Sequence, residues 1–122
     1  MIIPRGVRPE LHEFNAADVF LKLGKDVEFI KPSGTKNAKS PDVLVDGKEW
    51  EIKSALGNSR YTVEKQLKRA AHQSQNLIFD SRRTKLSTDY LKKEIARQLS
   101  QKTSIRAVKL ITKSGKVVDF VK

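Results

Sequence analysis

The fold of this chain is decided by residues 41–54, PDVLVDGKEWEIKS. This stretch contains two runs that are typical of β-strands, residues 42–46 and residues 49–54. Between them lies Asp46-Gly47, and an Asp-Gly pair between two strands is a strong signal for a two-residue hairpin turn. Pro41 fixes the backbone that enters the first run and cannot donate a hydrogen bond there. The stretch therefore predicts an antiparallel β-hairpin.

Helical and extended patterns alternate on both sides of this hairpin. The first helix carries Phe14, Ala17 and Leu21 at helical spacing, and Gly24 follows it as a stop signal. Ser87 is a capping residue at the start of the third helix, whose apolar stripe ends at Leu99. We predict helices over residues 10–23, 60–74 and 87–100, further strands over 26–30, 76–80, 106–112 and 116–120, and a loop over 31–40.

This order of elements predicts the class of the fold. Hairpins beside a crossover helix imply a mixed central β-sheet with helices packed on it, an α/β (α+β) architecture. The chain has 122 residues, which is the usual size of one domain. We therefore expect residues 1–122 to form a single domain.

Composition limits the chemistry that is open to the chain. It has no cysteine and two histidines, so disulfides and zinc sites of the cysteine or histidine type are not expected. Oxygen ligands would have to hold any metal, which favours a hard divalent ion such as Mg²⁺. No stretch approaches the roughly 20 apolar residues of a membrane span.

The positive charge is concentrated in the second half of the chain. The formal net charge is +11. Residues 1–59 hold nine bases and nine acids, whereas residues 60–106 hold twelve bases and four acids. A surface of this kind favours a polyanion such as nucleic acid, because neutralising phosphates releases counterions. A charge excess that serves solubility alone is the alternative.

The second predicted strand carries the candidate catalytic residues. Successive strand side chains alternate between faces, so Glu51 and Lys53 point away from the apolar face of that strand. The hairpin turn brings Asp42 back toward them. Two carboxylates and a lysine suit metal-dependent phosphodiester hydrolysis, with Asp42 and Glu51 as metal ligands and Lys53 acting on the water or the developing charge. Glu13, on the first helix, is a plausible fourth member.

The second predicted helix offers a basic face to a phosphate backbone. Lys65, Lys68 and Arg69 lie on that face, and Glu64 is their one acidic neighbour at helical spacing. We predict that these three bind nucleic acid. His72, on the same face, is interpreted as a solvated side chain.

At these residues the sequence resembles the PD-(D/E)xK nuclease superfamily, through Pro41-Asp42 and Glu51-Ile52-Lys53. More narrowly, it resembles the C-terminal toxin domains of contact-dependent growth inhibition proteins, CdiA-type polymorphic toxins of which several are tRNA nucleases. That likeness extends over nearly the whole chain, through His12-Glu13, Ala16-Ala17, residues 40–54, residues 76–80 with Arg82-Arg83, and residues 111–116.

The resemblance implies a function and a setting. By position it makes Glu13, Asp42, Glu51 and Lys53 the catalytic set, with Asp42 and Glu51 on the metal, and it adds Arg82 and Arg83 to the nucleic-acid contacts. It implies an αβββαβ core, Mg²⁺ as cofactor, tRNA as substrate and an immunity protein as partner. It also implies delivery as part of a larger bacterial protein that acts in the cytoplasm of a target cell, with a cytoplasmic protein as the alternative.

Three other functions stay open at this point. A DNA endonuclease would use the same core on another substrate. A non-catalytic nucleic-acid-binding module would bind phosphates through the basic helix, and its Glu/Lys strand face would have no catalytic role. A domain that only binds a protein partner would neither cleave nor bind nucleic acid.

Glu49 lies on the same predicted face as Glu51, so a shift in the register of the strand would move the metal-binding role to Glu49.

Overall fold

The computed structural model describes residues 1–32 and 40–122 and contains three helices and six strands in these ranges. Most of the predicted loop, residues 33–39, lies outside the described residues. The predicted elements are all present, with bounds that differ by a few residues. They are α1 (Leu11–Lys22), β1 (Val27–Phe29), β2 (Val43–Val45), β3 (Lys48–Ser54), α2 (Thr62–Ala71), β4 (Asn76–Asp80), α3 (Thr88–Leu99), β5 (Ala107–Ile111) and β6 (Val117–Val121).

The strands form one mixed sheet in the order β1-β2-β3-β4-β5-β6. β1, β2 and β3 pair antiparallel, β3, β4 and β5 pair parallel, and β5 and β6 pair antiparallel. Helices α2 and α3 make the two parallel crossovers, because each connects neighbouring parallel strands. The predicted mixed α+β architecture is confirmed.

The hairpin at Asp46-Gly47 sets the register of the first half of the sheet. Asp46 has φ 49° and Gly47 has φ 81°, the two positive values that a tight hairpin turn of this kind requires. Val43 consequently pairs with Trp50, and Val45 pairs with Lys48. A one-residue slip would turn every side chain of β3 to the wrong face.

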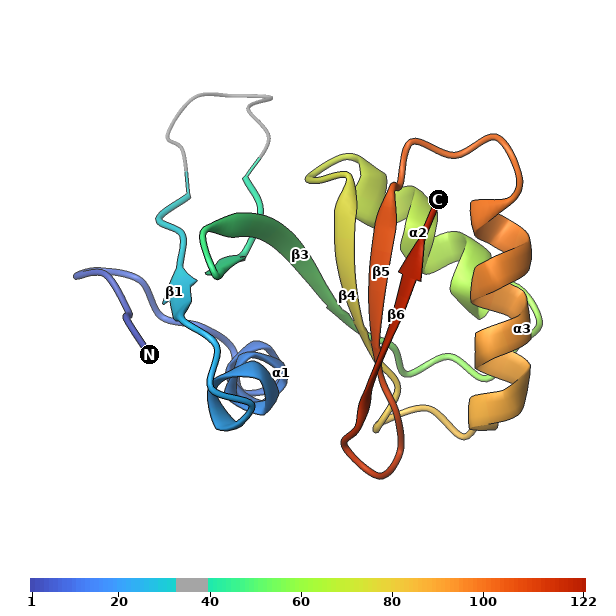
Figure 1. The fold of residues 1–122 in the computed structure, drawn as a ribbon, viewed down its shortest axis with the longest axis horizontal. Helices are drawn as coiled ribbons and strands as arrows, with labels where there is room; N and C mark the ends of the chain where they lie inside the picture. The colour runs from blue at the N-terminus through green and yellow to red at the C-terminus, as the bar shows by residue number, and fades with distance from the viewer. Residues whose placement is uncertain (33–39) are drawn as a thin grey trace.

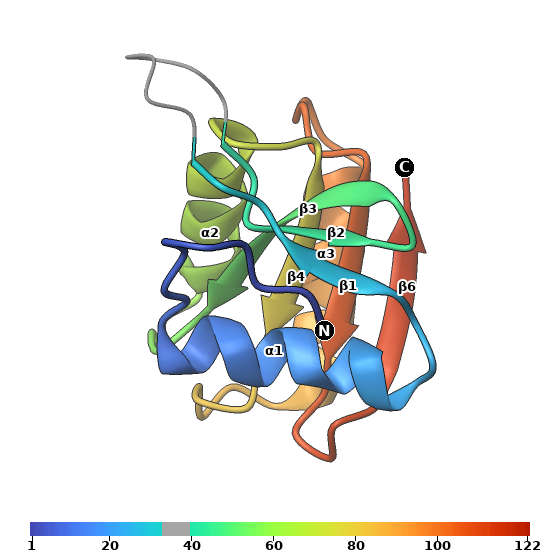
Figure 2. The same cartoon turned by 90° about the vertical axis from the view of Figure 1, so that its left-hand side faces the viewer.

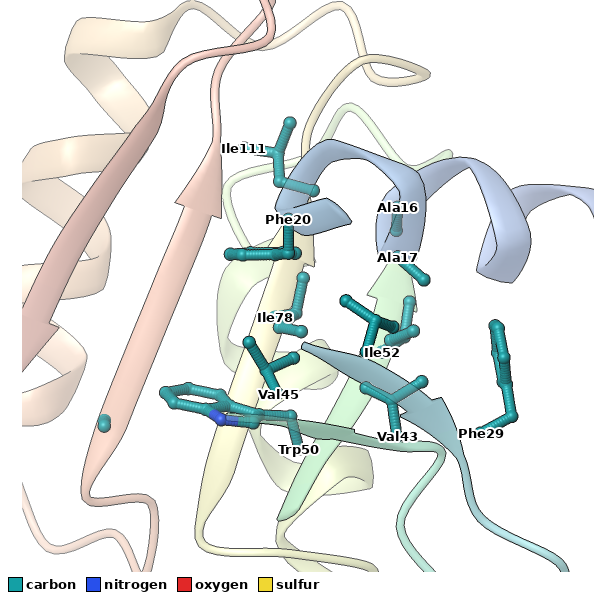
Figure 3. Packing of buried hydrophobic residues seen from close by; sticks show 12 residues of the cluster. Ala16, Ala17, Phe20, Phe29, Val43, Val45, Trp50, Ile52, Ile78 and Ile111 are labelled. Carbon is teal, nitrogen blue, oxygen red and sulfur yellow. The ribbon is translucent and has the colours of Figure 1, made fainter. Parts of the chain in front are cut away.

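Helix α1 covers one face of the sheet, and α2 and α3 cover the other (Figure 1). Under α1, the short side chains of Ala16 and Ala17 and the ring of Phe20 pack on Ile52 and Ile78 (Figure 3). Of the three residues whose spacing predicted this helix, Ala17 is buried, whereas Phe14 and Leu21 are 39% and 37% exposed. The buried stripe is rotated about the helix axis toward the two alanines, whose small side chains let the helix approach the sheet closely.

A second core fills the space between the sheet and the other two helices. Leu67 of α2 and the predicted stripe of α3, which includes Leu91, Ile95 and Leu99, pack there against Phe79. Ser87 caps α3 as predicted, because its hydroxyl accepts a hydrogen bond from the Tyr90 amide at 3.2 Å. None of the helices described is long and apolar enough to cross a membrane.

The two covered faces give β3 an unusual environment. Trp50 and Ile52 form the apolar face of this strand and enter the core under α1. Glu51 lies on the opposite face, beside Leu77 of β4, and only 5% of its surface is exposed. A carboxylate on a central strand between two cores is costly to bury, so its surroundings matter.

Candidate active site

Asp42 and Glu51 face each other across the β2–β3 hairpin. The register of that hairpin, continued by one residue beyond Val43 and Trp50, sets Asp42 opposite Glu51. The Asp42 amide donates to the Trp50 carbonyl oxygen at 3.0 Å, and the Asp42 carbonyl oxygen accepts from the Ile30 amide at 2.9 Å. The backbone of Asp42 is thus held by both neighbouring strands, which fixes the position of its carboxylate.

Lys53 is the cation next to this pair. Its ammonium Nζ lies 3.4 Å from Glu51 Oε2. The other oxygen, Glu51 Oε1, is buried and has no hydrogen-bond partner among the described residues. Buried polar atoms are rarely left unpaired in folded proteins, so this oxygen suits a ligand such as a metal ion.

Glu13 joins the group from the first turn of α1. Its Oε1 accepts a hydrogen bond from the Glu10 amide at 2.9 Å, which caps the helix. The same side chain lies close to Asp42, whose charge adds to the effect of burial in raising the pKa of Glu13. Glu13 therefore has a structural role in the helix start and a place beside the candidate catalytic pair.

The pKa values of these three carboxyl groups are all raised, and burial is the largest cause in each case. The pKa of Asp42 rises to about 6, because burial and the charge of Glu51 outweigh the hydrogen bond from the Ile52 amide. Burial raises the pKa of Glu51 against the opposing effects of Asp42 and Lys53. It also raises the pKa of Glu13. Lys53 compensates only part of the negative charge of these three carboxyl groups, and a divalent cation would supply the rest.

Asp42 and Glu51 are the residues that could hold such a cation. Among the described residues, no group of three or more His, Cys, Asp or Glu side chains is arranged as a complete metal cage. Mg²⁺ does not need one, because it keeps several waters and is commonly bound by one or two carboxylates together with substrate phosphates. The pair and the unpartnered Glu51 oxygen fit an ion of that type.

All four predicted catalytic residues line one cleft of about 560 Å³. We call it the carboxylate cleft. Its walls also include two of the predicted phosphate-binding residues, Lys65 and Arg69 of α2, so acidic and basic groups face the same space. The charged residues that line it are Glu10, Glu13, Asp42, Glu51, Lys53, Lys65 and Arg69, together with His12.

The other predicted contacts are placed differently. Lys68 is absent from the lining of the carboxylate cleft and pairs with Glu64 at 3.4 Å. Arg82 and Arg83 line an adjacent cavity instead. Glu49 is exposed and lies outside the carboxylate cleft, so the structure puts Glu51 rather than Glu49 in the site.

Sequence reasoning missed the loop that closes the cleft between β3 and α2. Gly57, Asn58 and Ser59 line the cleft beside Thr62. The loop is tied down by Thr84, whose hydroxyl donates to the Gly57 carbonyl oxygen at 2.6 Å. Gly57 was the signal available in the sequence, since glycine often marks a position where a side chain would not fit, and the structure places it close to Thr62.

Comparison with known proteins places this architecture in a family. Residues 39–117 match the family described as the contact-dependent growth inhibition CdiA C-terminal domain. The chain therefore belongs to the CdiA C-terminal toxin domain family. No curated protein matches the sequence significantly.

A solved structure shares the fold. It is a CdiA-CT/CdiI toxin and immunity complex from Burkholderia pseudomallei, with a TM-score of 0.67 and 15% sequence identity. The match covers 98% of this chain and 93% of the other. At this identity the likeness concerns the arrangement of helices and strands.

Proposed function

We propose that this chain is a metal-dependent endonuclease that hydrolyses phosphodiester bonds, with a PD-(D/E)xK active site. The observation that carries the proposal is the pairing of Asp42 with Glu51 across the hairpin, with Lys53 at 3.4 Å from Glu51. A solvated hairpin face would not require Glu51 to be buried with an unpartnered oxygen.

Each residue has a role that follows from its surroundings. Asp42 and Glu51 would bind Mg²⁺ through oxygens whose ionised forms are otherwise poorly compensated. The ion, when bound, polarises a phosphoryl oxygen and lowers the pKa of a water. Lys53 orients the attacking water or offsets charge at the phosphorus, and the ion pair with Glu51 keeps its ammonium at the site. Glu13 supports the arrangement from α1.

The basic wall of the carboxylate cleft supports a nucleic-acid substrate. Lys65 and Arg69 lie on the α2 side of the cleft, where they would contact phosphates next to the one being cleaved. We favour RNA, and tRNA in particular, because of the resemblance to growth-inhibition toxins that cut tRNA. A DNA endonuclease would use the same residues and is the second candidate.

We also propose an immunity protein as partner. The similar structure is a complex of a toxin with its immunity protein. A nuclease domain with a net charge of +11 offers an acidic partner strong electrostatic attraction. In this proposal the domain is carried by a larger bacterial protein and acts inside the target cell.

Incubation of the purified protein with total tRNA and, separately, with plasmid DNA tests the proposal. Each reaction is run with Mg²⁺ and with EDTA, for the native chain and for Glu51→Gln and Lys53→Ala. We expect loss of intact tRNA that needs the metal and both side chains. Cleavage of plasmid alone would keep the site and change the substrate.

Glu49→Gln is the matched control for Glu51→Gln, because Glu49 lies on the same strand but is exposed and outside the cleft. It should retain full activity. Retention of both nucleic acids in a low-salt gel shift, without cleavage under any metal, would contradict the nuclease and favour a binding module.

A further inference from the structure

A second cavity, of about 760 Å³, adjoins the carboxylate cleft. His12 and Ser54 line both, so the two spaces share a wall at the end of β3. The second cavity lies along α1, which crosses the sheet near the ends of β3 and β4 (Figure 2). We call it the α1 groove. Ligands of sheets with parallel strands commonly bind at the carboxyl ends of those strands, which is where this groove lies.

One stripe of α1 forms the apolar side of the groove. Leu11, Asn15, Val19 and Leu23 line it and recur every four residues, so they lie on one face of the helix. Leu11 and Leu23 are 75% and 58% exposed, although they are large apolar side chains. Twelve residues of helix separate them, about 18 Å at a rise of 1.5 Å per residue. The groove is therefore an extended track with exposed apolar surface.

The opposite side of the groove is held by an ion pair. Asp80, at the end of β4, is 3% exposed and binds Arg82 through both carboxylate oxygens at 2.8 to 3.0 Å. Arg82 also donates to the Asn15 carbonyl oxygen at 3.1 Å, which ties the loop after β4 to α1. The charge of Arg82 is thus paired within the protein, which gives this arginine a structural role, and its predicted phosphate contact stays a prediction.

Arg83 is a cation of the groove whose charge is available to a ligand. The carboxylates of the lining are engaged, Asp80 by Arg82 and Asp18 by Lys22 at 3.0 Å. Arg83 is exposed and makes no ion pair with any described residue. Its Nη1 lies 3.5 Å from Ser54 Oγ, at the wall shared with the carboxylate cleft. A phosphate at Arg83 would therefore be next to one in that cleft.

We propose that the α1 groove binds a short unpaired stretch of the nucleic-acid strand that the carboxylate cleft cleaves. This inference rests on the proposed function. Arg83 takes a phosphate adjoining the scissile one, and the bases lie against the stripe of Leu11, Val19 and Leu23. Bases that remain paired and stacked in a duplex cannot turn their faces to that stripe, so the groove selects single-stranded segments.

Methyl NMR of the Glu51→Gln protein tests the proposal without cleavage. The probes are a single-stranded RNA of six nucleotides and a blunt duplex of the same sequence. We expect the methyl signals of Leu11, Val19 and Leu23 to shift with the single strand and to stay in place with the duplex. Equal shifts with both probes, or none with the single strand, would overturn the inference.

Two further variants test the groove by affinity. Arg83→Gln should weaken single-strand binding about tenfold, the effect of losing one charge-assisted phosphate contact. Arg106→Gln is its control, because Arg106 is exposed and precedes β5, at the amino end of the parallel strands, opposite the end where the groove lies. Leu11→Ser should also weaken binding, whereas Leu21→Ser, on α1 but outside the groove, should not. Equal losses of single-strand affinity in Arg83→Gln and Arg106→Gln would contradict the role of Arg83.

These outcomes are separable from those of the proposed function. Cleavage by the native chain with no response of the groove methyls would remove the single-strand inference and leave the nuclease intact. Absence of cleavage by the native chain, with the groove methyls responding, would remove the nuclease and leave a single-strand binding site.

Discussion

The Asp42 carboxylate accepts a hydrogen bond from the Ile52 amide at 2.8 Å, through its Oδ2. This bond crosses from the start of β2 to the strand that carries Glu51 and Lys53. It holds the Asp42 carboxylate beside Glu51, against the repulsion between two like charges. The arrangement brings acidic groups together at a cost in stability, which is a common feature of functional sites.

That cost predicts a gain in stability for Asp42→Asn. The folded-state pKa of Asp42 is about 6, above its ordinary value of 3.8. A raised pKa favours the folded state below pH 4, and this contribution is lost as the pH rises through 6. Asparagine keeps an acceptor for the Ile52 amide and removes the charge. We expect the variant to be more stable than the native chain by about 1–3 kcal/mol at pH 8, and the difference to shrink toward pH 4.

Urea unfolding at a series of pH values measures this difference. Asp26→Asn is the control, because the Asp26 side chain is exposed and makes no ion pair with any described residue. If the unfolding free energies of Asp42→Asn and the native chain differ by the same amount from pH 4 to pH 8, the charge of Asp42 is not the cause of the gain in stability. Under the proposed function, the variant should lose nuclease activity while it gains stability, as expected for a residue that is kept for function.

Mg²⁺ should stabilise the native chain. An ion that binds the folded state alone adds RT ln(1 + [L]/Kd), about 2.7 kcal/mol at one hundred times the dissociation constant. The gain should increase with pH between 5 and 7, since the ligand carboxylates must lose their protons first. Thermal unfolding with and without Mg²⁺ measures it. An equal gain in Glu51→Gln would place the ion elsewhere.

Much of the fold was predictable because its signals are local. The Asp46-Gly47 turn predicted the hairpin, and the hairpin register placed Asp42 opposite Glu51. Short-range capping likewise predicted the start of α3 at Ser87. These features depend on residues that are close together in the sequence.

The rest depends on contacts between distant elements. The alternating pattern of its strand places Glu51 on the polar face, which would ordinarily be exposed. Glu51 is buried only because other elements cover that face. Arg82 and Arg83 look alike in the sequence, yet only Arg82 meets Asp80 and the Asn15 carbonyl oxygen. Leu11 and Leu23 are large apolar residues of the first predicted helix, yet they are exposed and line the α1 groove. Periodicity does not fix how a helix is rotated against its sheet.

Gly57→Ala should disturb the loop that closes the carboxylate cleft. A Cβ atom at this position would lie 2.7 Å from the Thr62 hydroxyl oxygen, which accepts from the Ser59 amide. We expect a loss of about 1–2 kcal/mol in unfolding free energy, together with reduced activity. Thr62→Ala removes the obstructing atoms, so the double variant should lose less than the sum of the single losses. If the losses of unfolding free energy in the two single variants simply add in the double variant, the close contact between residues 57 and 62 is not the cause of the loss in Gly57→Ala.

Arg82→Gln should lower the free energy of unfolding more than Asp80→Asn does. Asp80 has only 4% of its side chain exposed, whereas Arg82 has 32%. Removing the arginine leaves a buried carboxylate without its cation, whereas removing the carboxylate charge leaves an arginine that water can still reach. We expect unfolding losses of about 2–4 kcal/mol for Arg82→Gln and about 1–2 kcal/mol for Asp80→Asn in urea. Lys85→Gln, an exposed change in the same loop, should have almost no effect. A smaller loss from Arg82→Gln than from Asp80→Asn would mean that the ion pair does not secure this loop to α1, and that Arg82 is available to bind phosphate.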